Sequence, residues 1–83
     1  KEVLDMSKTY HISNNIRTLR FFAHEMTQNA LAEKVGVSRQ TIVAIEANKY
    51  SPSLELAFKI ALAFDVNITD VFSYIPESKD MEK

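Results

Sequence analysis

A single glycine separates two segments of helical pattern, and this arrangement limits the folds that the chain can adopt. Gly36 is the only glycine among the 83 residues. It follows Leu31, Ala32 and Val35, whose spacing predicts the inward side of a helix capped by Thr27. A glycine directly after the last periodic residue is typical of a helix end, because it adopts a left-handed backbone without a steric penalty. We therefore predict that this helix ends at the glycine.

A second helix is predicted to begin only two residues after this glycine. Ser38 is a candidate N-cap, and residues 39–47 continue at helical spacing with Ile42 and Ile45 on the inward side. Two helices joined by so short a turn cross steeply, and the small side chain of Ala32 lets their backbones approach. We therefore predict a helix-turn-helix over residues 27–47, in which the glycine, this alanine and the two isoleucines have structural roles.

A first helix is predicted before this motif, and a turn after it. Ile16, Leu19, Phe22 and Ala23 recur at three- and four-residue spacing, which is the pattern of an amphipathic helix with these residues inward. Asn48 tolerates a positive φ nearly as well as glycine does, so it can end the helix that begins at residue 39.

The rest of the chain predicts two more helices and two short strands. Residues 54–64 are apolar on nearly all sides, so we expect a mostly buried helix capped by Ser53. Thr69 is expected to cap a brief helix that runs through Phe72. The β-prone segments are Thr9–Ile12, followed by a cap or turn at residues 13–15, and Phe72–Ile75, which stops at Pro76.

The composition is that of one small folded domain. Hydrophobic residues form 46% of the sequence and charged residues 25%, which is ordinary globular usage. A chain of this length buries too little surface to supply two cores. We expect an N-terminal extension over residues 1–12, one domain over residues 13–76 and a polar tail over residues 77–83. The chain has no cysteine and no apolar run long enough for a membrane span, so the expected location is the cytoplasm.

The formal charge of −1 is unfavourable for binding nucleic acid, but the charges are unevenly distributed. Residues 13–49 contain five basic and three acidic side chains, whereas residues 50–83 contain three basic and six acidic ones. A folded chain with this asymmetry can present a cationic surface to phosphates and an acidic one away from them.

The outward side of the helix over residues 39–47 carries side chains suited to reading DNA bases. Arginine can donate two hydrogen bonds to guanine, glutamine can bond adenine, and threonine or valine can contact the thymine methyl group. The N-terminal turn of such a helix enters the major groove. Free N–H groups at helix N-termini also attract phosphate, which makes Thr27, Gln28 and Ser38 candidate backbone contacts. The candidate base contacts are Arg39, Gln40, Thr41, Val43 and Ala44.

The stretch Thr27–Ile42 resembles the lambda-repressor-like helix-turn-helix family, and the likeness continues over Ile45–Ala57. The resemblance covers about residues 15–75. It implies a mainly α domain of five helices, with a small two-stranded antiparallel sheet formed by the segments near Ile12 and Tyr74. It also implies a transcription regulator, in particular a repressor, that binds a palindromic operator on double-stranded DNA as a homodimer.

The resemblance assigns roles to individual side chains. It implies that Gln28 and Ser38 contact phosphates, and that Asn48 and Lys49 contact the DNA backbone. An arginine and a glutamate placed as Arg20 and Glu46 bridge two helices in this family, and we favour this structural role over a DNA contact. The base contacts that it implies are Arg39, Gln40 and Thr41, with Val43 and Ala44 adding to them.

Two departures from the family pattern affect the connections between helices. The segment from Phe21 to Thr27 is one residue longer than usual and lacks the glycine common there. Where relatives carry Asn-Gly after the helical glutamate, this chain has Ala47-Asn48, which removes a side-chain contact to phosphate. We expect the turn itself to survive, because asparagine can replace glycine at a positive φ.

Other functions are less well supported by the sequence. His11 and His24 have no cysteine or convincingly spaced carboxylate beside them, so neither a metal nor another cofactor is expected. No glycine-rich phosphate loop or nucleophile motif suggests an enzyme. The late apolar residues favour core or subunit interface over a ligand pocket. They are Phe58, Phe64, Phe72, Tyr74 and Ile75.

A second function of a different class stays open. The same fold also serves as the antitoxin half of toxin–antitoxin pairs, in which an apolar surface covers a toxin and DNA binding is secondary. The absence of a long toxin-wrapping segment after Ile75 favours the regulator.

Overall fold

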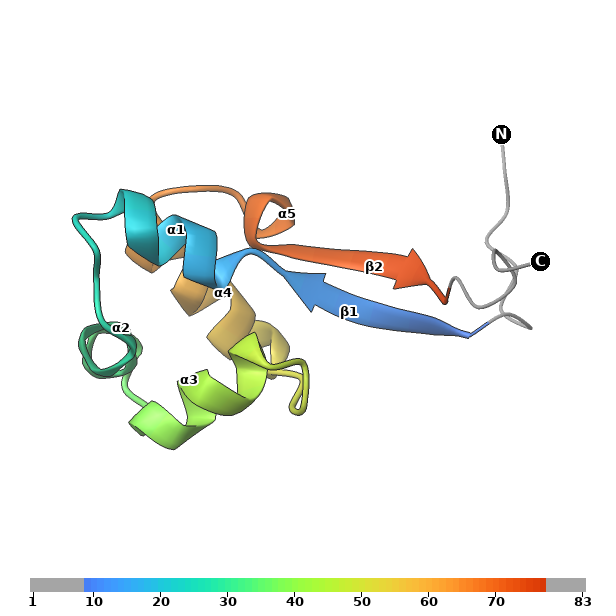
Figure 1. Ribbon diagram of the computed structural model, residues 1–83, viewed down its shortest axis with the longest axis horizontal. Coiled ribbons are helices and arrows are strands. Elements are labelled where there is room, and N and C mark those ends of the chain that lie inside the picture. Colours follow the sequence, from blue (N-terminus) through green and yellow to red (C-terminus); the bar gives the residue numbers. More distant parts are fainter. Residues whose placement is uncertain (1–8, 78–83) are drawn as a thin grey trace.

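The computed structural model describes residues 9–77, which form five helices and a two-stranded antiparallel sheet (Figure 1). The mainly α fold with a small sheet is therefore confirmed. Most of the predicted extension over residues 1–12 and of the tail over residues 77–83 lies outside the described residues. The elements are β1 (Tyr10–Asn14), α1 (Ile16–Phe22), α2 (Gln28–Val35), α3 (Arg39–Glu46), α4 (Leu54–Phe64), α5 (Ile68–Val71) and β2 (Phe72–Pro76).

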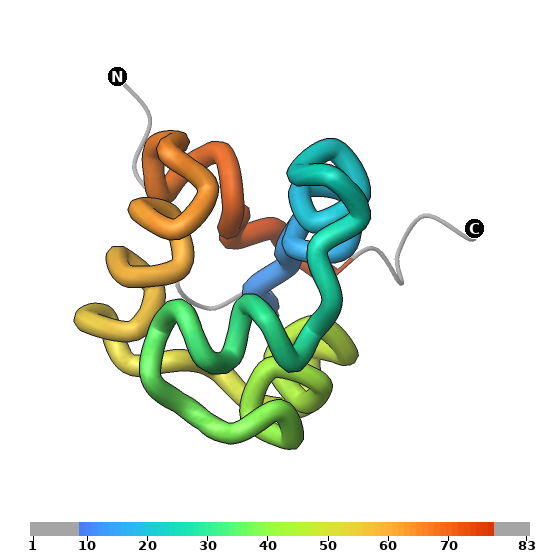
Figure 2. Tube along the Cα trace, turned by 90° about the vertical axis from the view of Figure 1, so that its left-hand side faces the viewer, coloured from blue at the N-terminus to red at the C-terminus, as the bar shows by residue number. Residues whose placement is uncertain are grey.

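The helices enclose one apolar core. Figure 2 shows α1 and α4 on opposite sides of the molecule, with α2 and α3 below them in this view. The helix α2 packs on both α3 and α4, and α4 packs on α5. The five inward positions predicted for the motif are all buried, which confirms the helical periods read from the sequence. They are Leu31, Ala32, Val35, Ile42 and Ile45.

The caps predicted for the two helices of the motif are present. The Oγ1 atom of Thr27 accepts a hydrogen bond from the Ala30 N–H at 2.9 Å, and Ser38 Oγ accepts one from the Thr41 N–H at 3.2 Å. Gly36 has φ 82°, the left-handed backbone predicted for the residue that ends α2. Three local signals therefore set the start of each helix and the turn between them.

Replacement of Gly36 by alanine should lower the free energy of unfolding by about 1–2 kcal/mol, because an alanine must hold the same left-handed backbone. A Cβ atom at this position would have no atom within 4 Å, so the effect would come from the backbone alone. Gly36→Asn should cost less, since asparagine tolerates this conformation. Urea denaturation of both variants tests the assignment, and a Gly36→Ala protein as stable as the wild type would contradict it.

The first helix ends earlier than predicted, and the prediction that one of its residues lies in the core is wrong. Phe22 is the last residue of α1 and is 76% exposed. The chain then turns through His24 and Glu25, whose φ angles are 59° and 55°. This longer connection directs Met26 toward the core in place of the phenylalanine.

Two predictions for the C-terminal helices are also wrong. The fifth helix is capped by Asn67 instead of Thr69, because the Asp70 carboxylate accepts a hydrogen bond from the Asn67 N–H at 3.0 Å and closes the first turn. The helix α4 is not mostly buried. It buries only Ala57, Ile60 and Ala61, because no other described element covers its opposite side, where Leu54, Phe58 and Leu62 are exposed.

The two strands form a ribbon that projects from the helical body (Figure 1). The strand β1 runs to Asn14, so it includes residues predicted as a turn, and β2 begins directly after α5. Ile12 pairs with Tyr74, and the Tyr10 and Tyr74 rings stack with centroids 5.0 Å apart. The ribbon explains the radius of gyration of 14.3 Å, which exceeds the roughly 12 Å expected for a compact chain of this size.

Candidate nucleic-acid interface

The helix α3 separates its core residues from its candidate base contacts. Ile42 and Ile45 are 0% and 2% exposed, which anchors one side of the helix to the core. The other side carries the predicted base contacts, and none of them is buried. Arg39 and Gln40 are exposed, whereas Thr41, Val43 and Ala44 are partly exposed.

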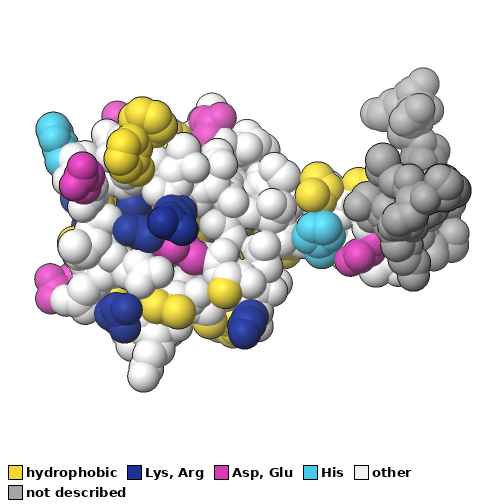
Figure 3. All heavy atoms as spheres, in the orientation of Figure 1, with side chains coloured by type: hydrophobic (Ala, Val, Ile, Leu, Met, Phe, Trp, Pro, Cys, Tyr) yellow, Lys and Arg dark blue, Asp and Glu magenta, His cyan; other side chains and the backbone are white. Residues whose placement is uncertain are grey.

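Basic side chains gather on the face of the molecule that includes this helix. Figure 3 shows Lys and Arg side chains spread over the helical body, with acidic side chains mainly at its edge. The exposed cations of α1, α3 and the following turn are Arg17, Arg39 and Lys49. The charge asymmetry of the sequence thus becomes a mildly cationic surface, although the whole chain carries a net charge of −1.

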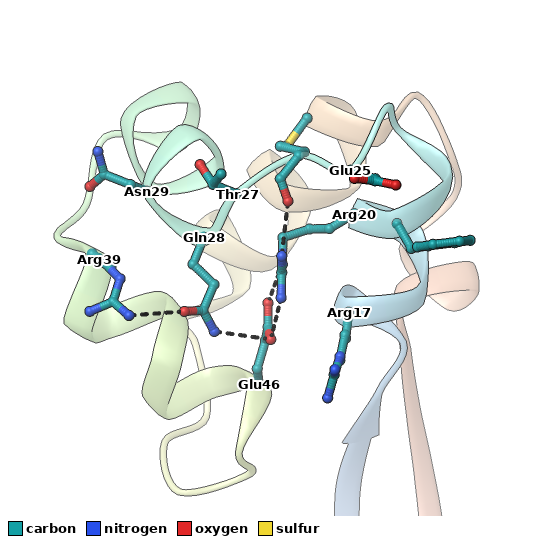
Figure 4. A pocket seen from close by; sticks show the side chains of 10 residues that line it. Arg17, Arg20, Glu25, Thr27, Gln28, Asn29, Arg39 and Glu46 are labelled. Carbon is teal, nitrogen blue, oxygen red and sulfur yellow. Dashed lines mark hydrogen bonds and ion pairs between the residues drawn. The ribbon is translucent and has the colours of Figure 1, made fainter.

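Beside α3, an ion pair ties three helices together (Figure 4). Arg20 of α1 meets Glu46 of α3 in a two-pronged contact, with Nε–Oε2 at 2.6 Å and Nη2–Oε1 at 3.0 Å. Arg20 Nη1 also donates to the Met26 carbonyl at 2.9 Å, and Gln28 of α2 donates to Glu46 Oε1 at 3.2 Å. The two charged side chains are only 16% and 10% exposed. The geometry supports the bridging role that we favoured for this pair over a DNA contact.

Gln28 links this ion pair to the first residue of α3. Its Oε1 atom accepts a hydrogen bond from Arg39 Nη2 at 3.4 Å, while its Nε2 atom donates to Glu46 (Figure 4). A side-chain amide has two N–H groups, so one remains free to donate to a phosphate. The candidate phosphate contact and the candidate base contact therefore touch each other at the start of α2 and α3.

Thr27 and Ser38 can each donate a hydrogen bond in addition to the capping bond that they accept. Each hydroxyl oxygen already accepts a backbone N–H as a helix cap, which leaves its own O–H available as a donor. Ser38 Oγ also lies 3.0 Å from Thr41 Oγ1, where either atom can be the donor. Both hydroxyls sit at helix N-termini, the positions that favour a phosphate.

The residues after α3 are held by an asparagine that the sequence reading did not single out. Asn14 of β1 donates through Nδ2 to the Ile45 carbonyl and to Asn48 Oδ1, both at 3.0 Å. Asn48 has φ 61°, which confirms the turn predicted there, and Lys49 is exposed beside it. No local sequence pattern points to this role of Asn14, because the contact joins residues more than thirty positions apart.

Arg17 is a second residue that the sequence reading did not assign to the site. It lines a hollow of about 730 Å³ between α1 and the helix-turn-helix, together with Gln28, Arg39 and the ion pair. Figure 4 shows its side chain extending from α1, with no dashed line to any other residue drawn. Within residues 9–77, no hydrogen bond or ion pair engages it. The arginine is thus a cation available to an external anion.

Two further kinds of feature are absent from residues 9–77. Within the part of the chain that the structure describes, no group of three His, Asp or Glu side chains could share a metal ion. None of the helices there is both long and apolar enough to cross a membrane.

Comparison with known proteins identifies the family. The helix-turn-helix family model matches residues 16–71. An uncharacterized HTH-type transcriptional regulator from Methanocaldococcus jannaschii is 65% identical over 51 residues, which cover 61% of this chain and 77% of that protein. The uncharacterized HTH-type transcriptional regulator YgzD from Bacillus subtilis is 47% identical over 62 residues, which cover 74% of this chain and 91% of that protein.

Solved structures agree with this fold. A candidate DNA-binding protein from Bacteroides fragilis superposes with a TM-score of 0.66 at 29% identity, over 75% of this chain and 98% of the other. The transcriptional regulator VanUg superposes with a TM-score of 0.67 at 23% identity, over 93% of this chain and all of that one, which supports the fold alone. With its motif, its fold and the match over residues 16–71, the chain belongs to the helix-turn-helix family, in the lambda-repressor-like group that its sequence resembles.

Proposed function

We propose that this chain is a sequence-specific DNA-binding transcription regulator, a repressor that binds a palindromic operator as a homodimer. The observation that carries the proposal is the division of α3 into a side anchored by Ile42 and Ile45 and an uncovered side with base-reading side chains. Its relatives in Methanocaldococcus jannaschii and Bacillus subtilis, named as HTH-type transcriptional regulators, support it. The protein would act in the cytoplasm, without a cofactor and without catalysing a reaction.

In this proposal, α3 lies in the major groove and reads the bases. Arg39 and Gln40 at its start are both exposed and would make the hydrogen bonds that distinguish guanine and adenine. The arginine ends in paired donors, which suit guanine, and the glutamine ends in a donor and an acceptor, which suit adenine. Thr41, Val43 and Ala44 would add contacts, in particular with thymine methyl groups.

The surrounding residues would hold the DNA backbone. Phosphate contacts set the position of a protein on the duplex without reading its sequence. The helix-capping hydroxyls and the free amide hydrogen of Gln28 would contact one stretch of backbone, and Asn48 and Lys49 another. To these we add Arg17, whose guanidinium lies at the open hollow between α1 and the motif. The full set is Arg17, Thr27, Gln28, Ser38, Asn48 and Lys49.

Selection of binding sites from random-sequence DNA tests this function. The expected product is a palindrome whose half-sites are centred about 10 base pairs apart, since a two-fold dimer places its reading helices one helical turn apart. Gel shifts with the selected site and a scrambled one would then measure specificity at a stated salt concentration. Failure to enrich any sequence would contradict base reading by α3.

Lys49→Ala should weaken binding to all sequences alike and should reduce the slope of log K against log salt by about one for each protomer, because a lost phosphate contact carries no sequence information. Lys34→Ala is the matched control, since Lys34 is exposed on α2 beside residues of α4 and outside the hollow that contains Arg17. Titrations at several salt concentrations measure both slopes. A change in preferred sequence for Lys49→Ala would contradict its role as a backbone contact.

A further inference from the structure

The last residue of β1 makes contacts at both ends of its side-chain amide. The Oδ1 atom of Asn14 accepts a hydrogen bond from the Ile16 N–H at 3.0 Å, at the start of α1. Its Nδ2 group donates to the Ile45 carbonyl and to Asn48 Oδ1, both at 3.0 Å, and lies 3.4 Å from the Glu46 carbonyl. One side chain thus links the ribbon to α1, to the end of α3 and to the turn that follows α3.

Two backbone groups fix the direction in which this amide faces. A backbone N–H can only donate a hydrogen bond, and a carbonyl can only accept one. The Ile16 N–H therefore requires the oxygen of Asn14 on one side, and the Ile45 carbonyl requires its nitrogen on the other. The reversed amide would place N–H against N–H and oxygen against oxygen, so these two partners determine its orientation.

The fixed amide of Asn14 sets the orientation of a second amide. Because the nitrogen of Asn14 faces Asn48, the latter must present its oxygen, which leaves its own Nδ2 group on the opposite edge of the amide. Within residues 9–77, no hydrogen bond uses this group, and Asn48 is exposed beside the exposed Lys49. Two N–H donors therefore stand next to a cation after α3. A phosphate has the acceptor oxygens and the negative charge that both groups favour.

We propose that Asn14 is a positioning residue for DNA binding, which holds the Asn48 amide with its N–H groups turned toward a phosphate of the DNA backbone. The proposal rests on the proposed function, in which Asn48 and Lys49 contact that backbone. Without Asn14, either edge of the Asn48 amide can face the phosphate, and the oxygen would repel it. Fixing the amide before DNA binds removes this unproductive orientation, which raises affinity without a new contact.

Asn14→Asp tests the direction of this arrangement. The aspartate keeps an oxygen for the Ile16 N–H but cannot donate, so the Asn48 amide should turn its N–H groups toward the carboxylate and its oxygen outward. Beyond the effect of the added charge, we expect binding to weaken about 10-fold for each protomer, the size of one hydrogen bond to a charged group. All DNA sequences should be affected alike. Fluorescence anisotropy at fixed salt measures binding, and circular dichroism checks the fold.

Ser73→Asp is the matched control for charge. Ser73 is exposed on β2, and it lies on the opposite face of the ribbon from Asn14, because Asn14 pairs with the preceding residue of β2. Its variant adds the same charge to the ribbon without a partner in this network.

Asn14→Ser provides a neutral second variant, which carries the test if the aspartate prevents folding. Its hydroxyl can accept the Ile16 N–H but is too short to reach Asn48, so the second amide is released instead of reversed. Binding should then weaken about twofold for each protomer, since one of two amide orientations is productive.

The effect of either variant must pass through Asn48. Asn48→Gly removes this amide and keeps the turn, since glycine adopts a positive φ freely. In this background, Asn14→Asp should weaken binding no more than Ser73→Asp does, and Asn14→Ser should have no effect. The proposal is overturned if the Asn14 variants weaken binding equally with and without the Asn48 side chain, or if Asn48→Gly binds DNA as tightly as the wild type. It is also overturned if Ser73→Asp has the same effect as Asn14→Asp.

These outcomes separate failure of this role from failure of the proposed function. A wild type that selects one operator, but in which the variants act additively, would overturn the role of Asn14 and leave base reading by α3 in place. A wild type that binds all DNA sequences equally, but in which the effect of Asn14→Asp requires Asn48, would support the role and contradict sequence-specific regulation. A wild type that binds no DNA would contradict both.

Discussion

Glu46→Ala should lower the free energy of unfolding by about 2–4 kcal/mol, because it removes the partner of a largely buried arginine. Arg20 would lose both prongs of its contact and keep only the Met26 carbonyl at 2.9 Å. Gln28 would lose its acceptor on α3 as well. Thermal and urea denaturation would measure this decrease in the free energy of unfolding. The decrease arises because the lost contacts join α1 and α2 to α3.

The DNA preference of this variant should stay the same. Glu46 is 10% exposed and its carboxylate is occupied by protein donors, so we expect it to take no part in reading bases. Glu33→Ala is the control, since that glutamate is exposed on α2 and no ion pair of residues 9–77 includes it; its stability should change by less than about 0.5 kcal/mol. A Glu46→Ala protein of normal stability that selects a different operator would reverse the assignment.

Arg39→Ala should relax base preference at one position in each half-site, by about 1–3 kcal/mol for each lost two-bond contact. A dimer loses the contact twice, so the effect on the whole operator should be about double. Arg39 is exposed and its protein partner is Gln28 at 3.4 Å, so the fold should be kept. Binding to operators that carry each base at each position would measure the change.

Arg17→Ala provides the matched comparison, because it removes an arginine from the same cationic surface. The side chain lies at the hollow beside α1 instead of on α3, so we expect weaker binding to every sequence and no change in base preference. If the two arginine variants had the same effect on specificity, the division between reading and backbone residues would be wrong.

The elements of the motif could be predicted from sequence because their signals are local. A hydroxyl at residues 27 and 38, a glycine at residue 36 and a period of apolar side chains each act within one or two turns of helix, and the structure has all of them. The bridge between Arg20 and Glu46 and the sheet were implied by family resemblance alone. No local pattern joins residues 26 positions apart.

The errors arose where tertiary contacts override local pattern. Phe22 has the right spacing for a core residue, but the turn through His24 and Glu25 brings Met26 to the core instead. The helix α4 is apolar nearly all round, which predicts burial, yet Leu54 and Phe58 are exposed because no other described element packs on that side of the helix. Asn14 and Arg17 were missed because their value depends on what the fold places beside them.

A double-mutant cycle between Arg39→Ala and single guanines of the selected operator tests base reading most directly. Replacing one guanine by 7-deazaguanine removes the N7 acceptor that an arginine would bond in the major groove. Base reading by α3 predicts that, at one position of each half-site, the two changes together weaken binding by less than the sum of their separate effects. Additive effects at every guanine of the operator would contradict it.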